Sequence, residues 1–467
     1  MNKVMEFSKK DLKKLIIPLI IEQTLVIMIG MADTVMVSSV GEAAVSGVSL
    51  VDMINVLLIN IFAAMATGGA VVASQLLGER KRGGACRAAS QLMLITIVLS
   101  AATMVLSILF RIPILRLVFG DIEYDVLKSA STYFWISAVS YPFIGLYNSC
   151  AALFRAMGNS RISMLTALAA NIIHIIGNAI GVYVLHMGVA GVAVPSLISR
   201  LFCAVIMIIF LSDKRREIYI RIKDFIPDLY MMKRILYIGI PSGLENSLFQ
   251  LGRILVVGII AAFGTVQIAA NAVANNLDSL GCIPGQALSL AMITVVGRCV
   301  GARDYDQVKY YTKKLLKITY MVTVAINAAI ILSMPLLLRL YNLSEETVRL
   351  AYILVLIHDG CAMLLWPAAF TLPNALRAAN DVKYTMIVSI ASMWIFRIIF
   401  SFILGRMLGW GAIGVWTAMI MDWVCRIIFF VARYRSDKWQ KKYVPVSQEH
   451  MDEETSGDPK GARTLDL

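Results

Sequence analysis

Long apolar runs without charges recur along nearly the whole chain, and each is about as long as a helix that crosses a lipid bilayer. A bilayer requires roughly 20 apolar residues per helical crossing. Backbone groups inside lipid must bond within the protein, which leaves helices or closed barrels as spanning structures. Hydrophobic residues make up 59% of the 467 residues and charged residues 16%, whereas a soluble domain is about 25% charged. The chain is therefore predicted to be an all-α polytopic membrane protein.

Twelve transmembrane helices are expected. The first apolar run is full length and is followed directly by another, so we interpret it as a retained helix rather than a cleaved signal peptide. The predicted helices span residues 13–37, 50–77, 89–110, 129–153, 163–186, 189–211, 235–262, 268–297, 315–337, 350–375, 384–405 and 411–432.

The positive charge of the chain is concentrated on one side of the predicted helices. Of the 43 Lys and Arg residues, 33 fall on the side of the N-terminus, six on the opposite side and four within helices. This asymmetry follows the positive-inside rule. We therefore expect a multi-pass protein of the cell (inner) membrane with both termini in the cytoplasm. The net charge of +13 needs no nucleic-acid partner.

An internal repeat divides the chain into two similar halves. Four short motifs of the first half return in the same order in the second half, at an offset of 222 or 223 residues. A single match of this length arises easily by chance, but four in register do not. The matched positions are Pro18 with Pro241, Glu22 with Glu245, Gly78 with Gly301, Arg155 with Arg377, and Gly191 with Gly414.

Each half carries six predicted helices, so each half begins and ends on the same side of the membrane. Two such halves are related by a pseudo-two-fold axis along the membrane normal. We predict a six-helix lobe at residues 1–212, a cytoplasmic linker at 213–229 and a second six-helix lobe at 230–435. Residues 440–467 are polar and without periodicity, which predicts a disordered tail.

Several motifs resemble those of the multidrug and toxic compound extrusion (MATE) family. They are GMADTVMVSSVGEAAVSGVSL after the first helix, VASQLLGERKRGGACRA after the second and LFRAMGNSR after the fourth, with IAANAVANNLDSLGCIPGQALSLAMITVVGRCVGARD and LPNALRAANDVKY in the second half. The resemblance covers nearly the whole membrane part. It implies a two-lobe antiporter that exports organic, often cationic, compounds against an inward flux of H⁺ or Na⁺.

Glu245 is the main candidate for ion coupling. It lies about 15 Å into its predicted helix, at a depth where a charged side chain usually faces a cavity or a partner. Pro241, four residues earlier, removes a backbone hydrogen bond and favours a flexible joint. The resemblance implies a cation-coupling glutamate on the seventh helix, which Glu245 matches, and Glu22 is its repeat mate and a second candidate. The alternative is a neutral glutamate hydrogen-bonded into the lobe interface.

Two aspartates complete the predicted cation-coupling residues. Asp33 closes the first predicted helix and matches the aspartate that, by resemblance, is involved in proton or sodium coupling in the N-terminal lobe. Its alternative interpretation is a carboxylate at the outer membrane interface. Asp359 lies on the tenth predicted helix.

Other polar side chains within helices predict a substrate cavity. On the eighth predicted helix, Asn275, Asn276 and Asp278 form a polar stripe, which an interhelical polar network would explain nearly as well. Arg253 is a further cavity residue, and we expect it to pair with Asp278 or Asp359. Three further charges lie close enough to predicted helix ends to reach the membrane interface: Asp52, Asp422 and Arg426.

The first lobe contributes Asn171, His174 and Asn178 to the predicted cavity. Many MATE relatives carry an aspartate where this chain has Ile175, so the cation site of this lobe is open to question. His174 could titrate near physiological pH, and the alternative is a buried, hydrogen-bonded histidine.

No motif of an enzyme or a primary pump occurs. The predicted helices contain no HExxH, GxSxG or DDxxD-like acidic motif, and no GxxxxGK[ST] phosphate loop is found. We therefore expect no catalytic residue and a carrier driven by an ion gradient. The seven scattered cysteines suggest neither a disulfide framework nor a metal site. We expect no cofactor besides the coupling ion, small organic substrates, membrane lipids as surroundings, and a monomer. The alternative is an exporter or flippase of a lipid-linked or other endogenous metabolite, for which fourteen helices would be the sign.

Overall fold

The computed structural model describes residues 5–120, 123–339, 341 and 343–445, and these residues form helices joined by turns, without a strand. The first half of the chain contains α1 (Lys9–Ser38), α2 (Glu42–Gly78), α3 (Arg82–Leu109), α4 (Arg111–Phe119), α5 (Tyr124–Val139), α6 (Tyr141–Ala156), α7 (Arg161–Ala179) with its π-helical continuation η1 (Ile180–Val184), and α8 (Ala190–Leu211). The all-α prediction is confirmed.

The second half begins with the 3-10 turn η2 (Ile222–Phe225). It continues with α9 (Leu229–Ala261), α10 (Thr265–Gly301), α11 (Tyr305–Arg339), α12 (Glu345–Trp366), η3 (Pro367–Thr371), α13 (Leu372–Ala378), α14 (Val382–Ser392), η4 (Met393–Ile399), η5 (Ser401–Met407), α15 (Gly411–Arg435) and η6 (Lys438–Lys441). The π-helical segments η3, η4 and η5 continue their neighbouring α-helices.

The predicted number of membrane crossings is confirmed. Eleven helical segments of the described residues are long and apolar enough to cross a membrane. The remaining predicted helix, the fourth at 129–153, is divided at Ser140 into α5 and α6, each of 16 residues. Pro142 explains the break, because its ring nitrogen carries no hydrogen for a helical bond. Ser140 keeps right-handed helical angles, so residues 124–156 form one continuous helical path.

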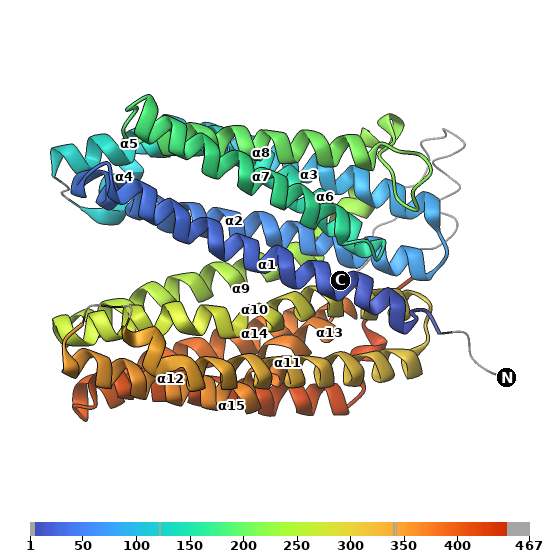
Figure 1. The fold of residues 1–467 in the computed structure, drawn as a ribbon. Helices are drawn as coiled ribbons and strands as arrows, with labels where there is room; N and C mark the ends of the chain where they lie inside the picture. Colours follow the sequence, from blue (N-terminus) through green and yellow to red (C-terminus); the bar gives the residue numbers. More distant parts are fainter. Residues whose placement is uncertain (1–4, 121–122, 340, 342, 446–467) are drawn as a thin grey trace.

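The helices form two bundles, α1–α8 and α9–α15, which lie one above the other in Figure 1. Each bundle buries the beginning of the other bundle's first helix. Leu12 and Leu15 of α1 are fully buried in a core cluster of the second bundle. Their repeat mates, Ile235 and Ile238 of α9, are buried in a core cluster of the first bundle. The repeat thus forms the same contact twice, as a two-fold relation requires.

Two glycines of the repeat set the distance between the bundles. A Cβ added to Gly301 of α10 would lie 1.9 Å from the carbonyl oxygen of Gln75, and one added to Gly78 of α2 would lie 2.0 Å from that of Arg298. Only glycine lets the two helices come this close. The ribbons of the two bundles converge at this end and diverge toward the other (Figure 1).

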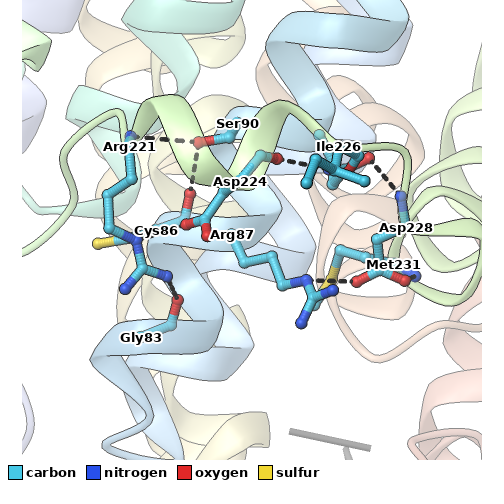
Figure 2. A network of polar contacts seen from close by, with 10 residues as sticks. Gly83, Cys86, Arg87, Ser90, Arg221, Asp224, Ile226, Asp228 and Met231 are labelled. Atoms are coloured by element: carbon cyan, nitrogen blue, oxygen red, sulfur yellow. Dashed lines mark hydrogen bonds and ion pairs between the residues drawn. The ribbon is translucent and has the colours of Figure 1, made fainter. Parts of the chain in front are cut away.

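The linker between the bundles is held along α3 (Figure 2). Gln91 Nε2 donates a hydrogen bond to the carbonyl oxygen of Asp224 at 2.6 Å. Arg87 forms an ion pair with Asp228, with 2.7 Å between Nε and Oδ2. Asp228 also caps α9, because its side chain accepts the N–H of Met231 at 3.0 Å. The linker therefore joins the two bundles as an anchored segment.

The predicted tail, 440–467, is in part ordered. Residues 446–467 lie outside the described residues, but the disorder prediction is wrong for 440–445. Trp439 is 1% exposed and stacks on Tyr434 with 5.4 Å between ring centroids. The hydroxyl of Tyr443 donates a hydrogen bond to Glu79. Aromatic side chains thus anchor a segment that its polar composition assigned to the tail.

Candidate functional site

A cavity of about 390 Å³ lies within the second bundle, between α9, α10, α12, η3, α13, η4 and α15. Four of the predicted site residues line it: Glu245, Arg253, Asn275 and Asp278. Its other lining includes aromatic side chains and three further arginines. The cavity has the size of a small-molecule site.

Glu245 forms an ion pair in the wall of this cavity. One oxygen, Oε1, lies 2.5 Å from Nη2 of Arg377 on α13. The other, Oε2, is buried and has no hydrogen-bond partner among the described residues. The helix α9 continues through Pro241 without a break. The Glu245–Arg377 pair therefore links this long helix to the short helix α13.

The repeat mate of this pair exists in the first bundle. Glu22 Oε1 lies 3.6 Å from Nη1 of Arg155. In contrast to Glu245, both oxygens of Glu22 are hydrogen-bonded, by the hydroxyls of Tyr147 at 3.3 Å and Ser163 at 2.7 Å. The glutamate motif and the arginine motif of the repeat therefore meet in each bundle as a carboxylate–guanidinium pair. Of these two glutamates, only Glu245, which lines the cavity, keeps a carboxylate oxygen without a hydrogen-bond partner among the described residues.

His358 connects two of the predicted aspartates. Its Nε2 lies 2.8 Å from Asp278 Oδ1, and its Nδ1 lies 2.9 Å from Asp359 Oδ1. The imidazole is 2% exposed, and Asp359 is fully buried. Trp416 and Trp423 cover the ring edge to face, with centroids at 5.4 Å and 4.9 Å. Asp359 therefore lies behind the cavity wall, one imidazole away from Asp278.

Cys282 joins this cluster. Its thiol donates to Asp278 Oδ1 at 3.3 Å. Ligand atoms of Asp278, Cys282 and His358 lie within 4.8 Å of one another and could hold a metal ion. The spacing of these residues in the sequence contained no such signal, because the histidine comes from α12 and the other two residues from α10.

The expected ion pair of Arg253 is not formed. Both proposed partners, Asp278 and Asp359, accept hydrogen bonds from His358 instead. Among the described residues no carboxylate lies within 4.0 Å of the Arg253 guanidinium, and the exposed side chain lines the cavity. The prediction is wrong because helical periodicity sets the face of a residue without identifying the helix opposite.

The polar stripe of α10 is divided between the cavity and its surroundings. Asn275 and Asp278 line the cavity, together with Ser279. Asn275 Nδ2 donates to the carbonyl oxygen of Asn271 at 2.8 Å. Asn276 is exposed and does not belong to the lining residues that the described chain supplies.

The predicted residues of the first bundle form a separate polar cluster. Asn178 Nδ2 donates to Asp33 Oδ1 at 2.8 Å, and His174 Nε2 lies 3.4 Å from the same oxygen. His174 is also within 2.6 Å of the hydroxyl of Ser196. Asn171 contacts the backbone of α1 instead, since its Nδ2 donates to the carbonyl oxygen of Leu25 at 3.0 Å. These residues lie outside the cavity of the second bundle.

Ile175 takes no part in this cluster, because its side chain is 40% exposed. The preceding residue, His174, lies beside Asp33 instead of Ile175. The first bundle thus pairs the imidazole of His174 with Asp33. The second bundle contains a similar pair, formed by His358 and Asp278.

The prediction that three charges reach the membrane interface is wrong. Asp422 and Arg426 are 0% and 3% exposed and form an ion pair with 2.9 Å between Oδ1 and Nε. Asp52 lies well inside α2, which begins at Glu42 rather than at residue 50, and accepts a hydrogen bond from Tyr133 at 3.2 Å. Asp422 and Arg426 pair with each other across one turn of α15, and Asp52 is bonded by a tyrosine of α5.

Several cavity residues escaped the sequence analysis. Arg377, Arg397, His358 and Arg426 line the cavity, although none was assigned to it from the sequence. For Arg377 a signal existed, since its motif repeats at an offset of 222 residues, one less than that of Glu245. For Arg397 the only signal was a charge inside an apolar run.

Comparison with known proteins gives consistent matches over the whole membrane part. The model of the MatE family matches residues 18–180 and 241–403, once in each bundle. The chain is 26% identical over 434 residues to the uncharacterized transporter YisQ of Bacillus subtilis, covering 91% of this chain and 94% of that protein. It is 26% identical over 447 residues to the probable multidrug resistance protein NorM of Thermotoga maritima, covering 93% and 94%.

Solved structures share the fold. An outward-facing conformation of a multidrug resistance MATE family transporter of the MOP superfamily superposes with a TM-score of 0.86 at 21% identity, over 93% of this chain and 97% of that chain. At this identity the likeness concerns the arrangement of the helices.

Proposed function

Because this chain belongs to the MatE family, we propose that it is a secondary active antiporter that exports small organic, drug-like compounds in exchange for H⁺ or Na⁺. Members of this family are transporters and not enzymes, and the chain is a multi-pass membrane transporter. We further propose that it works as a monomer in the cell membrane, with the basic segments and both termini in the cytoplasm.

The observation that carries the proposal is the free oxygen of Glu245. Oε1 is bound to Arg377, while Oε2 is buried in the cavity region without a partner among the described residues. A proton or Na⁺ that binds the carboxylate would compete with the guanidinium for its charge. Since Glu245 lies on α9 and Arg377 on α13, ion binding would loosen a link between two helices of the cavity wall.

The other carboxylates receive different roles in this proposal. Asp278 and Asp359 flank His358 and offer a second place where a proton can be held and exchanged. Asp33 with His174 provides the corresponding group in the first bundle. Glu22 has both oxygens hydrogen-bonded, so we assign it to the structure of the first bundle.

Coupling can be tested in proteoliposomes that contain a fluorescent organic substrate and an imposed H⁺ or Na⁺ gradient. Gradient-driven transport is expected for the native protein and should be lost in Glu245→Gln, which keeps the shape of the side chain and removes its charge. Glu42→Gln serves as the matched control, since Glu42 is exposed in the first turn of α2. Undiminished transport by Glu245→Gln would rule out the coupling role, and comparing the two gradients identifies the ion.

A further inference from the structure

The charges that line the cavity of the second bundle do not balance. Four arginines line it, together with two carboxylates. Both carboxylates already have a cationic or imidazole partner within the protein. Glu245 is paired with Arg377 at 2.5 Å, and Asp278 with His358 at 2.8 Å.

Of the three remaining arginines, Arg426 is neutralised by a buried carboxylate that does not line the cavity. Arg426 is paired with the buried Asp422 and donates from Nη2 to the carbonyl oxygen of Ser389 at 3.0 Å. Arg253 and Arg397 are left over. In the described part of the chain neither has a carboxylate within 4.0 Å. Both also line a smaller adjoining cavity of about 80 Å³, so they stand together where the two spaces meet.

Arg397 is the stronger of these two observations because it is buried. Its residue is 8% exposed, its Nη1 contacts the thioether sulfur of Met393 at 3.8 Å, and its guanidinium lies 5.3 Å from the centre of the Phe249 ring. A thioether is a weak acceptor, and a guanidinium stays charged in a protein. A charge at this depth requires a partner, and no carboxylate of the described residues lies within 4.0 Å of this guanidinium.

We propose that the compound bound in this cavity is a small organic anion, whose carboxylate or sulfonate is held by Arg397 and Arg253. Its apolar body packs against the aromatic wall formed by Phe249, Phe370 and Trp423. The resemblance to MATE transporters favours organic cations, but a cation would be repelled by two unpaired guanidinium groups. That this anion is also the exported substrate rests on the transport function proposed above.

Two probes that share a fluorophore and differ in charge test the proposal. Dansylglycine carries a carboxylate and dansyl-ethylenediamine an ammonium group. Binding is followed by energy transfer from tryptophan, since Trp366 and Trp423 line the cavity, with the full-length protein in phosphatidylcholine nanodiscs. We expect dansylglycine to bind at least tenfold tighter. Arg397→Gln should raise its Kd by about tenfold to a hundredfold, the effect of losing a charged hydrogen bond.

Arg397→Lys and Arg406→Gln are the matched controls. The first keeps the charge and should retain most of the preference for the acid. The second removes an arginine that packs on Phe402 outside the cavity lining and should bind both probes as the native protein does. Equal or tighter binding of the amine, or an unchanged Kd in Arg397→Gln, would overturn the proposal. Displacement of dansylglycine by phosphatidylglycerol would also overturn it, by assigning the arginines to a lipid headgroup.

Binding and transport fail separately in this design. Dansylglycine that binds in nanodiscs but is not moved by either gradient in proteoliposomes would refute the antiport function and leave the anion site intact. Gradient-driven transport of the amine without binding of the acid would refute the anion site and support the antiport function.

Discussion

Replacing Gly301 by alanine is expected to push the two bundles apart at the end where α2 meets α10. The new Cβ would lie 1.9 Å from the carbonyl oxygen of Gln75, while real Cβ contacts essentially never fall below 3.0 Å. The clash is with backbone, which no rotamer change relieves. The helices must therefore separate locally by at least about 1.1 Å, the difference between these distances.

The cost applies mainly to the conformation in which this end is closed. Inserting a methyl group into a tight contact costs about 1–3 kcal/mol. Since about 1.4 kcal/mol corresponds to a factor of ten, the equilibrium should shift by roughly 5- to 140-fold toward conformations with this end open. Gly78→Ala should act alike, with its Cβ 2.0 Å from the carbonyl oxygen of Arg298. The double variant should add little, because either methyl group already separates the same contact.

Thiol labelling can measure this shift. Ser74 is fully buried at the same interface, with its Cβ 2.9 Å from a Cβ added to Gly297. In a background without the seven native cysteines, Ser74→Cys should react with a water-soluble maleimide in proportion to the open population. Gly301→Ala should raise the rate, whereas Gly258→Ala, whose Cβ meets nothing within 4 Å, should not. Equal rates in the two variants would refute the reasoning.

Two further predictions concern stability. Tyr311→Phe removes the hydroxyl that accepts the Phe7 N–H at 3.0 Å and donates to the Phe7 carbonyl oxygen at 2.7 Å. The loss should weaken the attachment of the segment before α1 by about 1–3 kcal/mol, so limited proteolysis of this segment should accelerate. An unchanged rate would contradict the anchoring role of Tyr311. Asp381→Asn weakens the ion pair with Arg433, whose Nε and Nη2 donate to the carboxylate at 2.6 and 3.1 Å. A loss of about 3 kcal/mol in the free energy of unfolding should lower the unfolding temperature in detergent. An unchanged unfolding midpoint would show that the pair is dispensable for stability.

The anchoring of the chain ends shows how composition alone misleads. Residues 440–445 are polar on average, yet Tyr443 reaches Glu79, 364 residues away in sequence. The division of the predicted fourth crossing at Ser140 was also missed, although Pro142 marks it. Both features depend on one or two residues, which an average over a segment hides.

The membrane architecture followed from the sequence by itself. Each apolar run must satisfy its backbone hydrogen bonds internally, so number, type and length of the helices are local properties. The repeat at offset 223 likewise predicted two related bundles, because a duplicated sequence folds into duplicated units.

Only the tertiary structure decided which charges meet. Glu245 and Arg377 are 132 residues apart, and both belong to repeated motifs whose contact the repeat did not reveal. Arg253 was predicted to pair with Asp278 or Asp359, both of which bond to His358 instead. Arg397 has no carboxylate within 4.0 Å among the described residues. A helix's periodicity determines which face a charge occupies, but the helix that covers this face depends on packing between distant segments. The polarity of the cavity is therefore a property of the fold, while the presence of charges inside the membrane could be read from the sequence.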